Sequence, residues 1–198
     1  MLANRLSILL AERDMTIKEL TTKTGLSRNT VSNLVNKPTG NISVKTTDLL
    51  CNYLKITPRE FFEYSPVYLS FPNNVSSHGN IVARIDGLPR IFEYTITVDK
   101  NAPDERLSFY NADVSFDKFL TLRIGGKGNE DFQFMVYTRL SARFQKIVLE
   151  RLEELVDAFI SSEFKGTILS KQIKISCAIV MNESNAEQFL LNRTVGPA

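Results

Sequence analysis

The stretch TIKELTTKTGLSRNTVSNLVN, residues 16–36, has the pattern of two short helices joined by a tight turn. Thr16 and Glu19 have the spacing of a capping box, which predicts a helix start at Thr16. Gly25 predicts the end of that helix, because the residue just past a helix C-terminus commonly needs a positive φ, which glycine adopts without a Cβ clash. Ser27 is a good N-cap for a second helix. The stretch therefore predicts a helical hairpin.

The second helix of this pair has an apolar side and a polar side. The residues expected in the interior recur at helical spacing: Leu26, Val31, Leu34 and Val35. The other side carries amides, hydroxyls and a guanidinium, from Arg28, Asn29, Thr30, Ser32 and Asn33. Direct base readout uses such groups, because Arg pairs bidentately with guanine and Asn with adenine. Since residues 27–36 include no Asp or Glu to repel phosphates, this face predicts double-stranded DNA as a partner.

Residues 4–64 resemble the Cro and C-repressor type (Xre-like) helix-turn-helix family. The matching motifs are KEL at residues 18–20, TGLS at 24–27, TVSNL at 30–34 and TPREFFE at 57–63. The resemblance implies an all-α domain of five helices, with the second helix of the pair in the major groove. It implies base contacts from Ser27, Arg28, Asn29, Thr30 and Asn33. It also implies phosphate contacts from Thr16, Asn36, Lys37, Thr39 and Ser43.

The chain length and the distribution of charge indicate a two-domain protein, with residues 1–65 as the DNA-binding domain and residues 66–198 as the other domain. Residues 1–65 hold 9 Lys and Arg against 6 acidic residues, whereas the remainder holds 15 against 16. The positive excess therefore lies on the DNA-binding part. Because this excess is small, we expect affinity to depend on dimerisation rather than on a strongly basic surface.

Beyond residue 66 the helical period gives way to strand-like runs. We expect strands at residues 67–71, 81–86, 91–98, 116–124, 132–137 and 173–179, with a hairpin turn at 125–131. A long amphipathic helix is predicted at 141–164, a short helix at 185–191 and a loose tail from Arg193. The predicted fold of this part is α+β, an antiparallel sheet with one long helix, and we recognise no family for it.

The apolar stripe of the long helix has two interpretations. It covers one face of the sheet, or part of it forms a homodimer interface, for which Leu152, Leu155 and Phe159 are the candidate residues. The aromatic residues between 109 and 144 likewise fit either a core or an apolar pocket or groove for a ligand.

The composition predicts no cofactor and no metal site. The chain has a single His, and its two cysteines, Cys51 and Cys177, are far apart in apolar patterns that predict buried free thiols. Residues 1–14 do not resemble a signal peptide, and no apolar run approaches the ~18 residues of a membrane helix. We therefore expect a cytoplasmic protein without membrane association.

The sequence favours a DNA-binding transcriptional regulator, with the second domain dimerising the chain, sensing a signal, or both. The resemblance implies a repressor, because members of this family commonly repress transcription. An alternative is an interaction protein whose second domain binds a partner protein or peptide, as in antitoxin- or antirepressor-type control. An enzyme, such as a LexA-like self-cleaving peptidase, is not expected, because its Ser and Lys candidates, Ser108, Ser115, Lys118 and Lys127, are isolated residues.

Overall fold

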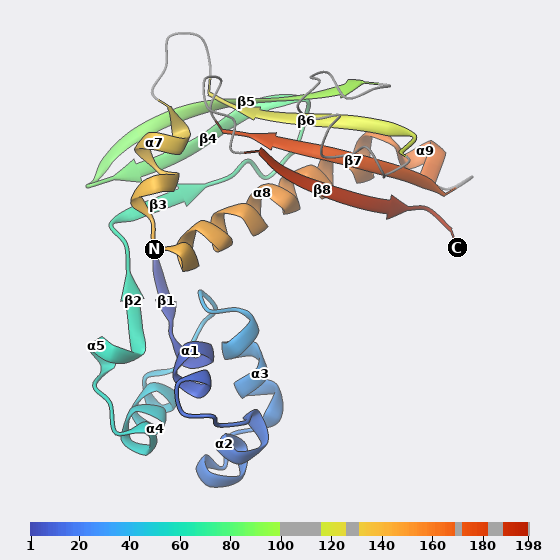
Figure 1. Cartoon of the computed structure of the whole chain (residues 1–198). Helices are drawn as coiled ribbons and strands as arrows, with labels where there is room; N and C mark the ends of the chain where they lie inside the picture. The colour runs from blue at the N-terminus through green and yellow to red at the C-terminus, as the bar shows by residue number, and fades with distance from the viewer. Residues whose placement is uncertain (100–115, 126–130, 169–171, 182–187, 198) are drawn as a thin grey trace. The chain divides into compact units, whose positions relative to one another are not determined.

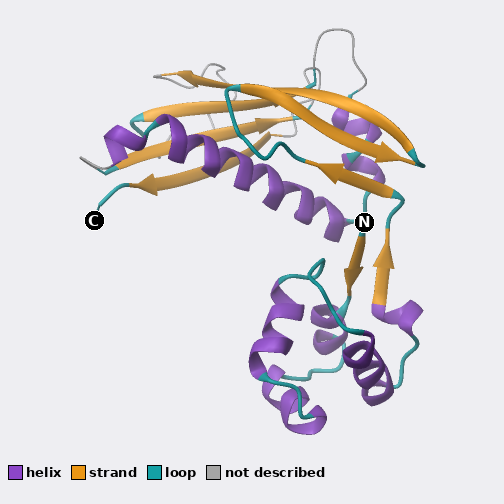
Figure 2. Cartoon of the chain, turned by 180° about the vertical axis from the view of Figure 1, so that it is seen from behind, coloured by secondary structure: helices purple, strands orange, loops and turns teal. Residues whose placement is uncertain are grey.

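The computed structural model describes residues 1–99, 116–125, 131–168, 172–181 and 188–197. The chain forms two compact units, Met1–Pro66 and Val67–Ala198 (Figure 1). The first unit is helical, and the second is built on a sheet with a long helix (Figure 2). This is the predicted fold class.

The first unit contains the predicted helices and a small two-stranded sheet. Its helices are α1 (Leu6–Ala11), α2 (Ile17–Thr24), α3 (Arg28–Asn36), α4 (Val44–Leu54) and α5 (Pro58–Phe61). They enclose an apolar core of Leu6, Leu9, Leu10, Leu20, Val31, Leu34, Leu50, Cys51, Leu54 and Phe61. Both α2 and α5 begin with a complete capping box, at Thr16 and Thr57 respectively. The helix boundaries are thus set largely by local side-chain to backbone hydrogen bonds.

The two-stranded sheet was not predicted. Strands β1 (Leu2–Asn4) and β2 (Phe62–Tyr64) pair in antiparallel orientation, and the Ser65 amide donates to the Met1 carbonyl at 2.8 Å. Three residues are too few to show the alternation that identifies a strand. The sheet joins the two ends of the helical unit.

The second unit contains a six-stranded sheet in the order β3-β4-β5-β6-β7-β8. Its strands are β3 (Val67–Ser70), β4 (His78–Ile85), β5 (Leu88–Asp99), β6 (Lys118–Ile124), β7 (Ile173–Val180) and β8 (Gln188–Val195). Asp86 and Gly87, both with positive φ, make the tight turn between β4 and β5. The long helix α8 (Ala142–Glu163) lies along one face of the sheet, which we call the inner face (Figures 1 and 2).

The sheet is antiparallel, as predicted, at every pair except β6 with β7, which run parallel. The helical segment that includes α8 connects these two strands. A parallel pair needs such a crossover connection, whereas the sequence-based prediction placed a hairpin turn after β6. Residues 126–130 of that predicted turn lie outside the described residues.

Residues 132–137 are helical, so the prediction of a strand there was wrong. The segment forms α7 (Phe132–Met135) and a 3-10 turn, η1 (Tyr137–Arg139). Asp131 caps α7 by accepting a hydrogen bond from the Phe134 amide at 3.1 Å. Phe132, Val136 and Leu140 are buried four residues apart, while Phe134 is 67% exposed. Burial therefore follows a helical period in this segment, although its apolar residues also alternate.

The predictions of a helix at 185–191 and a loose tail from Arg193 were also wrong. Residues 188–195 form β8, which pairs with β7 along its whole length, and residues 185–187 lie outside the described part. Arg193 is tied to α8 by its Nε atom, 2.8 Å from Asp157 Oδ1. Pairing with β7, which the local sequence does not encode, determines this strand.

The apolar stripe of α8 is buried within the second unit. Leu152 is fully buried, and Leu155 and Phe159 are each only 4% exposed. These three candidate dimer residues belong to the core of the single chain. Of the aromatic residues considered above, Phe119, Phe132, Tyr137 and Phe144 are likewise buried, whereas Phe109 and Tyr110 lie outside the described residues.

Candidate nucleic-acid interface

The turn between α2 and α3 has the geometry that the sequence predicts. Gly25 has φ 72° and ψ 5°, and its amide donates to the Thr21 carbonyl at 2.9 Å. No atom outside its immediate neighbours lies within 4 Å of the position of a Cβ at Gly25, so backbone conformation rather than space favours glycine there. Ser27 then caps α3 by accepting a hydrogen bond from the Thr30 amide at 3.1 Å. The turn is therefore held by its own residues.

Helix α3 presents the predicted polar face to solvent. Val31 and Leu34 are buried against the core, whereas the side chains predicted to contact bases are exposed or, for Thr30, half-buried: Ser27, Arg28, Asn29, Thr30 and Asn33. The Ser27 and Thr30 hydroxyls lie 2.9 Å apart and hydrogen bond to each other, so both are partly engaged. Arg28, Asn29 and Asn33 have the free donors and acceptors that base edges require.

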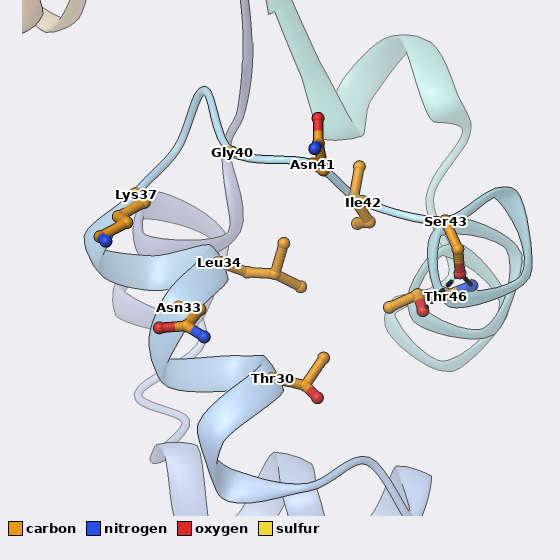
Figure 3. A pocket seen from close by; sticks show the side chains of 9 residues that line it. All are labelled: Thr30, Asn33, Leu34, Lys37, Gly40, Asn41, Ile42, Ser43 and Thr46. Atoms are coloured by element: carbon orange, nitrogen blue, oxygen red, sulfur yellow. Dashed lines mark hydrogen bonds between the residues drawn. The ribbon is translucent and has the colours of Figure 1, made fainter.

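A hollow of about 370 Å³ lies between α3 and the start of α4 (Figure 3). Thr30, Asn33 and Lys37 line it from α3 and its C-terminal end, and Ser43 and Thr46 line it from the start of α4. Ser43 caps α4 by accepting from the Thr46 amide at 3.0 Å. The structure thus brings two predicted base residues and two predicted phosphate residues to one surface. The positive end of the α4 dipole adds to its attraction for an anion.

Asn36 and Thr39 are exposed but do not line this hollow. Asn36 lies in the last turn of α3, and Thr39 lies in the loop that leads to α4. Both positions are accessible to a ligand along the C-terminal end of α3.

Asn4 was missed by the sequence-based prediction, although it positions this loop. It is 1% exposed, and its Nδ2 donates to the carbonyls of Leu34 and Pro38 at 3.0 Å each. Its backbone amide also donates to Pro38 O at 2.8 Å, and its Oδ1 accepts from the Leu6 amide at 3.0 Å. A buried amide with all these partners fixes the chain where it leaves α3. The signal for this role is a polar residue just before the first apolar helix.

Thr16 differs from the other predicted phosphate residues because it already has an anionic partner. The Glu19 carboxylate accepts from the Thr16 amide at 2.7 Å and from the Thr16 hydroxyl at 2.8 Å. These hydrogen bonds lower the pKa of Glu19, and the one from the Thr16 backbone amide has the larger effect. A phosphate at this end of α2 would have to displace a charged carboxylate.

The lowered pKa of Glu19 makes the start of α2 sensitive to pH. The cap stabilises α2 fully above the unfolded pKa of Glu19, and this contribution is lost as the pH falls through the lower folded pKa. At pH 7 we expect Glu19→Gln to lower the temperature at which α2 unfolds. This temperature is measured by NMR as the midpoint for loss of the folded-state amide signals of α2. Below the folded pKa the difference from the wild type should vanish. A difference that stays the same as the pH falls through the folded pKa of Glu19 would contradict this prediction.

Residues 5–66 match the family described as the Cro/C1-type HTH DNA-binding domain. Residues 5–66 are a Cro/C1-type helix-turn-helix domain. This helix-turn-helix domain contains the α2, turn and α3 arrangement described above, and it binds DNA. The match ends at residue 66, at the boundary between the two units, and does not extend to the second unit.

A solved structure of a candidate DNA-binding protein from Bacteroides fragilis is also similar to part of the chain. The similarity has 27% sequence identity, covers 32% of this chain and 100% of that chain, and has a TM-score of 0.29. The assignment of the helix-turn-helix domain therefore rests on the family match. No curated protein is significantly similar to the chain.

The described residues outside the helix-turn-helix domain offer little that indicates metal or membrane chemistry. No group of three or more His, Cys, Asp or Glu among them is placed to hold a metal ion. No helix in the described ranges has the length and apolar character needed to cross a bilayer. Of the peptidase candidates, Lys118 is on β6, whereas Ser108, Ser115 and Lys127 lie outside the described residues.

Proposed function

We propose that the chain is a sequence-specific transcriptional regulator that represses by binding a palindromic operator as a homodimer. The observation that carries this proposal is the exposed polar face of α3, free of carboxylates, in a helix-turn-helix domain. In this proposal α3 enters the major groove. Ser27, Arg28, Asn29, Thr30 and Asn33 contact base edges.

The hollow between α3 and α4 supports a phosphate-binding role for the residues around it. In this proposal Lys37 and Ser43 contact the DNA backbone there, with Asn36 and Thr39 beside them. Thr16 contacts a phosphate only if that phosphate displaces Glu19. Phosphate contacts fix the register of the protein on the duplex but carry no sequence information.

Lys37→Ala is expected to weaken binding to all DNA sequences by a similar factor. The slope of log affinity against log salt should become shallower by about 1, because one fewer counterion is released. Fluorescence anisotropy with specific and random duplexes over a salt series measures both quantities. Lys146→Ala is the matched control, since Lys146 is an exposed lysine of α8 in the other unit. A loss restricted to the specific duplex would contradict the phosphate role.

Two copies of the helix-turn-helix domain are needed for useful specificity. A single domain of this size reads few base pairs, whereas two domains on a palindrome read twice as many. The small positive excess of residues 1–65 gives little non-specific affinity to compensate. We therefore assign dimerisation to the second unit.

Comparison of the full chain with a fragment of residues 1–66 tests this assignment. We expect light scattering to find a dimer for the full chain and a monomer for the fragment, and the fragment to bind operator DNA more weakly. A full chain that is monomeric both free and on DNA would overturn the homodimer proposal. A dimeric fragment would move dimerisation to the helix-turn-helix domain.

Signal sensing has one supporting feature in the second unit. A cavity of about 460 Å³ lies between residues 68–75 and α8, and its size suits a small molecule or a short peptide. Its charged lining residues, Arg151 and Glu154, pair with each other at 2.6 Å. This cavity is our candidate site for an effector, whether a small molecule, a peptide or a segment of a partner protein. Thermal-shift screening of the full chain against small molecules and peptides tests it.

A further inference from the structure

We propose that β8 is the dimerisation edge of the second unit. In this arrangement β8 of one copy pairs in antiparallel orientation with β8 of a second copy, so that the two sheets become one continuous sheet. The inference rests on the proposed homodimer and names its interface. It replaces the stripe of α8, which the core of the single chain uses.

Strand β8 lies at the end of the sheet. The strand order places β7 on one side of β8 and no described strand on the other. All eight residues pair with β7, and in such a strand every second residue turns its N–H and C=O groups away from the neighbour. The outer edge is therefore a row of backbone donors and acceptors.

Strand β8 lacks several of the features that protect natural edge strands from pairing. Natural edge strands are commonly short or carry Pro, Lys or a bulge. The β8 sequence QFLLNRTV contains none of these residue types and is eight residues long. Its single charged side chain, Arg193, points inward, which can protect an edge, but its charge is paired with Asp157, at 2.8 Å, and with Glu153, at 3.0 Å. No unpaired charge of its own side chains thus opposes the approach of a second β8.

The opposite edge of the sheet is much less suited to such pairing. Strand β3 has four residues, and Phe71 and Pro72 follow it directly. A strand of this length offers few backbone groups, and proline cannot donate a hydrogen bond. Of the two edges, β8 is the better template for a second copy.

The apolar side chains of β8 are only partly covered by the single chain. Phe189 and Leu191 lie on the inner face but are only half-buried, whereas Cys177 and Ile179, opposite them on β7, are fully buried. A second copy of β8 would extend the inner face and cover this apolar surface. Continuation of a half-covered core across an edge is typical of a permanent interface.

Symmetry restricts the register of the pairing. Two identical antiparallel strands in one sheet are related by a two-fold axis perpendicular to the sheet, so inner faces remain on the same side. Residues that oppose each other must then share a face, and side chains alternate along each strand. One residue, such as Leu191 or Asn192, therefore lies directly opposite its own copy, and the axis passes midway between the two.

Light scattering of the full chain over a concentration series tests the proposal with matched variants. The edge variant carries Asn192→Lys and Thr194→Lys, both exposed on the outer face of β8. The control carries Thr95→Lys and Thr97→Lys, exposed on the outer face of the central strand β5. Thr194 lies opposite Lys174 and Thr95 opposite Arg123, so each variant places a new lysine beside an existing cation. We expect the dimer dissociation constant to rise at least tenfold in the edge variant and to stay within twofold in the control.

A wild-type dimer whose edge variant associates equally well would overturn the edge assignment and leave the homodimer proposal intact. A wild type that is monomeric both free and on DNA would overturn both. Because Asn192 also hydrogen bonds to Ser176, the edge variant could fail to fold, and hydrogen exchange on the wild type then decides. The amides of residues 188–195 should gain protection as concentration rises through dimerisation. Protection that does not depend on concentration would overturn the proposal.

Discussion

Arg28→Ala and Asn29→Ala are each expected to weaken operator binding by about 1 to 3 kcal/mol and to relax sequence preference at one position of each half-site. Both side chains are exposed at the start of α3. Because the N-terminal residues of a recognition helix contact base edges, their loss removes hydrogen bonds that the wrong base cannot make. Anisotropy titrations against the operator and its single-base variants measure the affinity and the preference.

Arg59→Ala is the matched control for Arg28→Ala. Arg59 is an exposed residue of α5, on the other side of the same unit from α3 (Figures 1 and 2). The Arg59→Ala substitution removes the same charge without changing the exposed polar face of α3. If Arg28→Ala and Asn29→Ala weakened all sequences by one common factor, α3 would contact the backbone only and the proposed base readout would be wrong.

Leu152→Glu is expected to unfold the second unit. Leu152 is fully buried on α8, and Leu→Ala at such sites costs about 2 to 5 kcal/mol. A glutamate costs more, since it also places an unpaired carboxyl group in the core. Domains are commonly stable by only about 5 to 15 kcal/mol, so one such change removes most of the margin. Hydrogen exchange with mass spectrometry should show lost protection in β3 to β8 and α8, with the helix-turn-helix domain retained.

Ser162→Glu provides the comparison on the same helix, because Ser162 is exposed and the substitution adds the same charge. It should leave the protection pattern unchanged. A folded, dimeric Leu152→Glu protein would show that the α8 stripe is not the core of this unit. A folded but monomeric one would return that stripe to the dimer interface in place of β8.

The helix-turn-helix domain could be predicted largely from sequence because its boundaries depend on neighbouring residues. Thr16 with Glu19, Gly25, Ser27, and Thr57 with Glu60 each act within a few residues, and the structure places them as expected. The pairing of β1 with β2 and the role of Asn4 depend on residues far apart in the chain. Such contacts leave only weak local signals. The hydrogen bonds from Thr16 to Glu19 follow from the capping box itself, so they could have been predicted from the sequence.

The second unit was less predictable because its topology depends on long-range pairing. The period of α8 identified the long helix correctly. Apolar residues alternate in 132–137 as they would in a strand. The segment is nevertheless helical, and Phe132 and Val136, four residues apart, are both buried on the same side of it. Residues 188–195 become a strand only because β7 lies beside them. The edge strand that we propose for dimerisation therefore could not be predicted from the sequence without the strand order of the sheet.

The most direct test of the account is selection of bound duplexes from a random DNA pool by the full chain, followed by sequencing. We predict enrichment of an inverted repeat whose half-site centres lie about 10 base pairs, or a multiple of one helical turn, apart. The same selection with Arg28→Ala should lose preference at one symmetric pair of positions. Enrichment of no motif, or of a motif that Arg28→Ala and Asn29→Ala leave unchanged, would contradict recognition of an operator by α3.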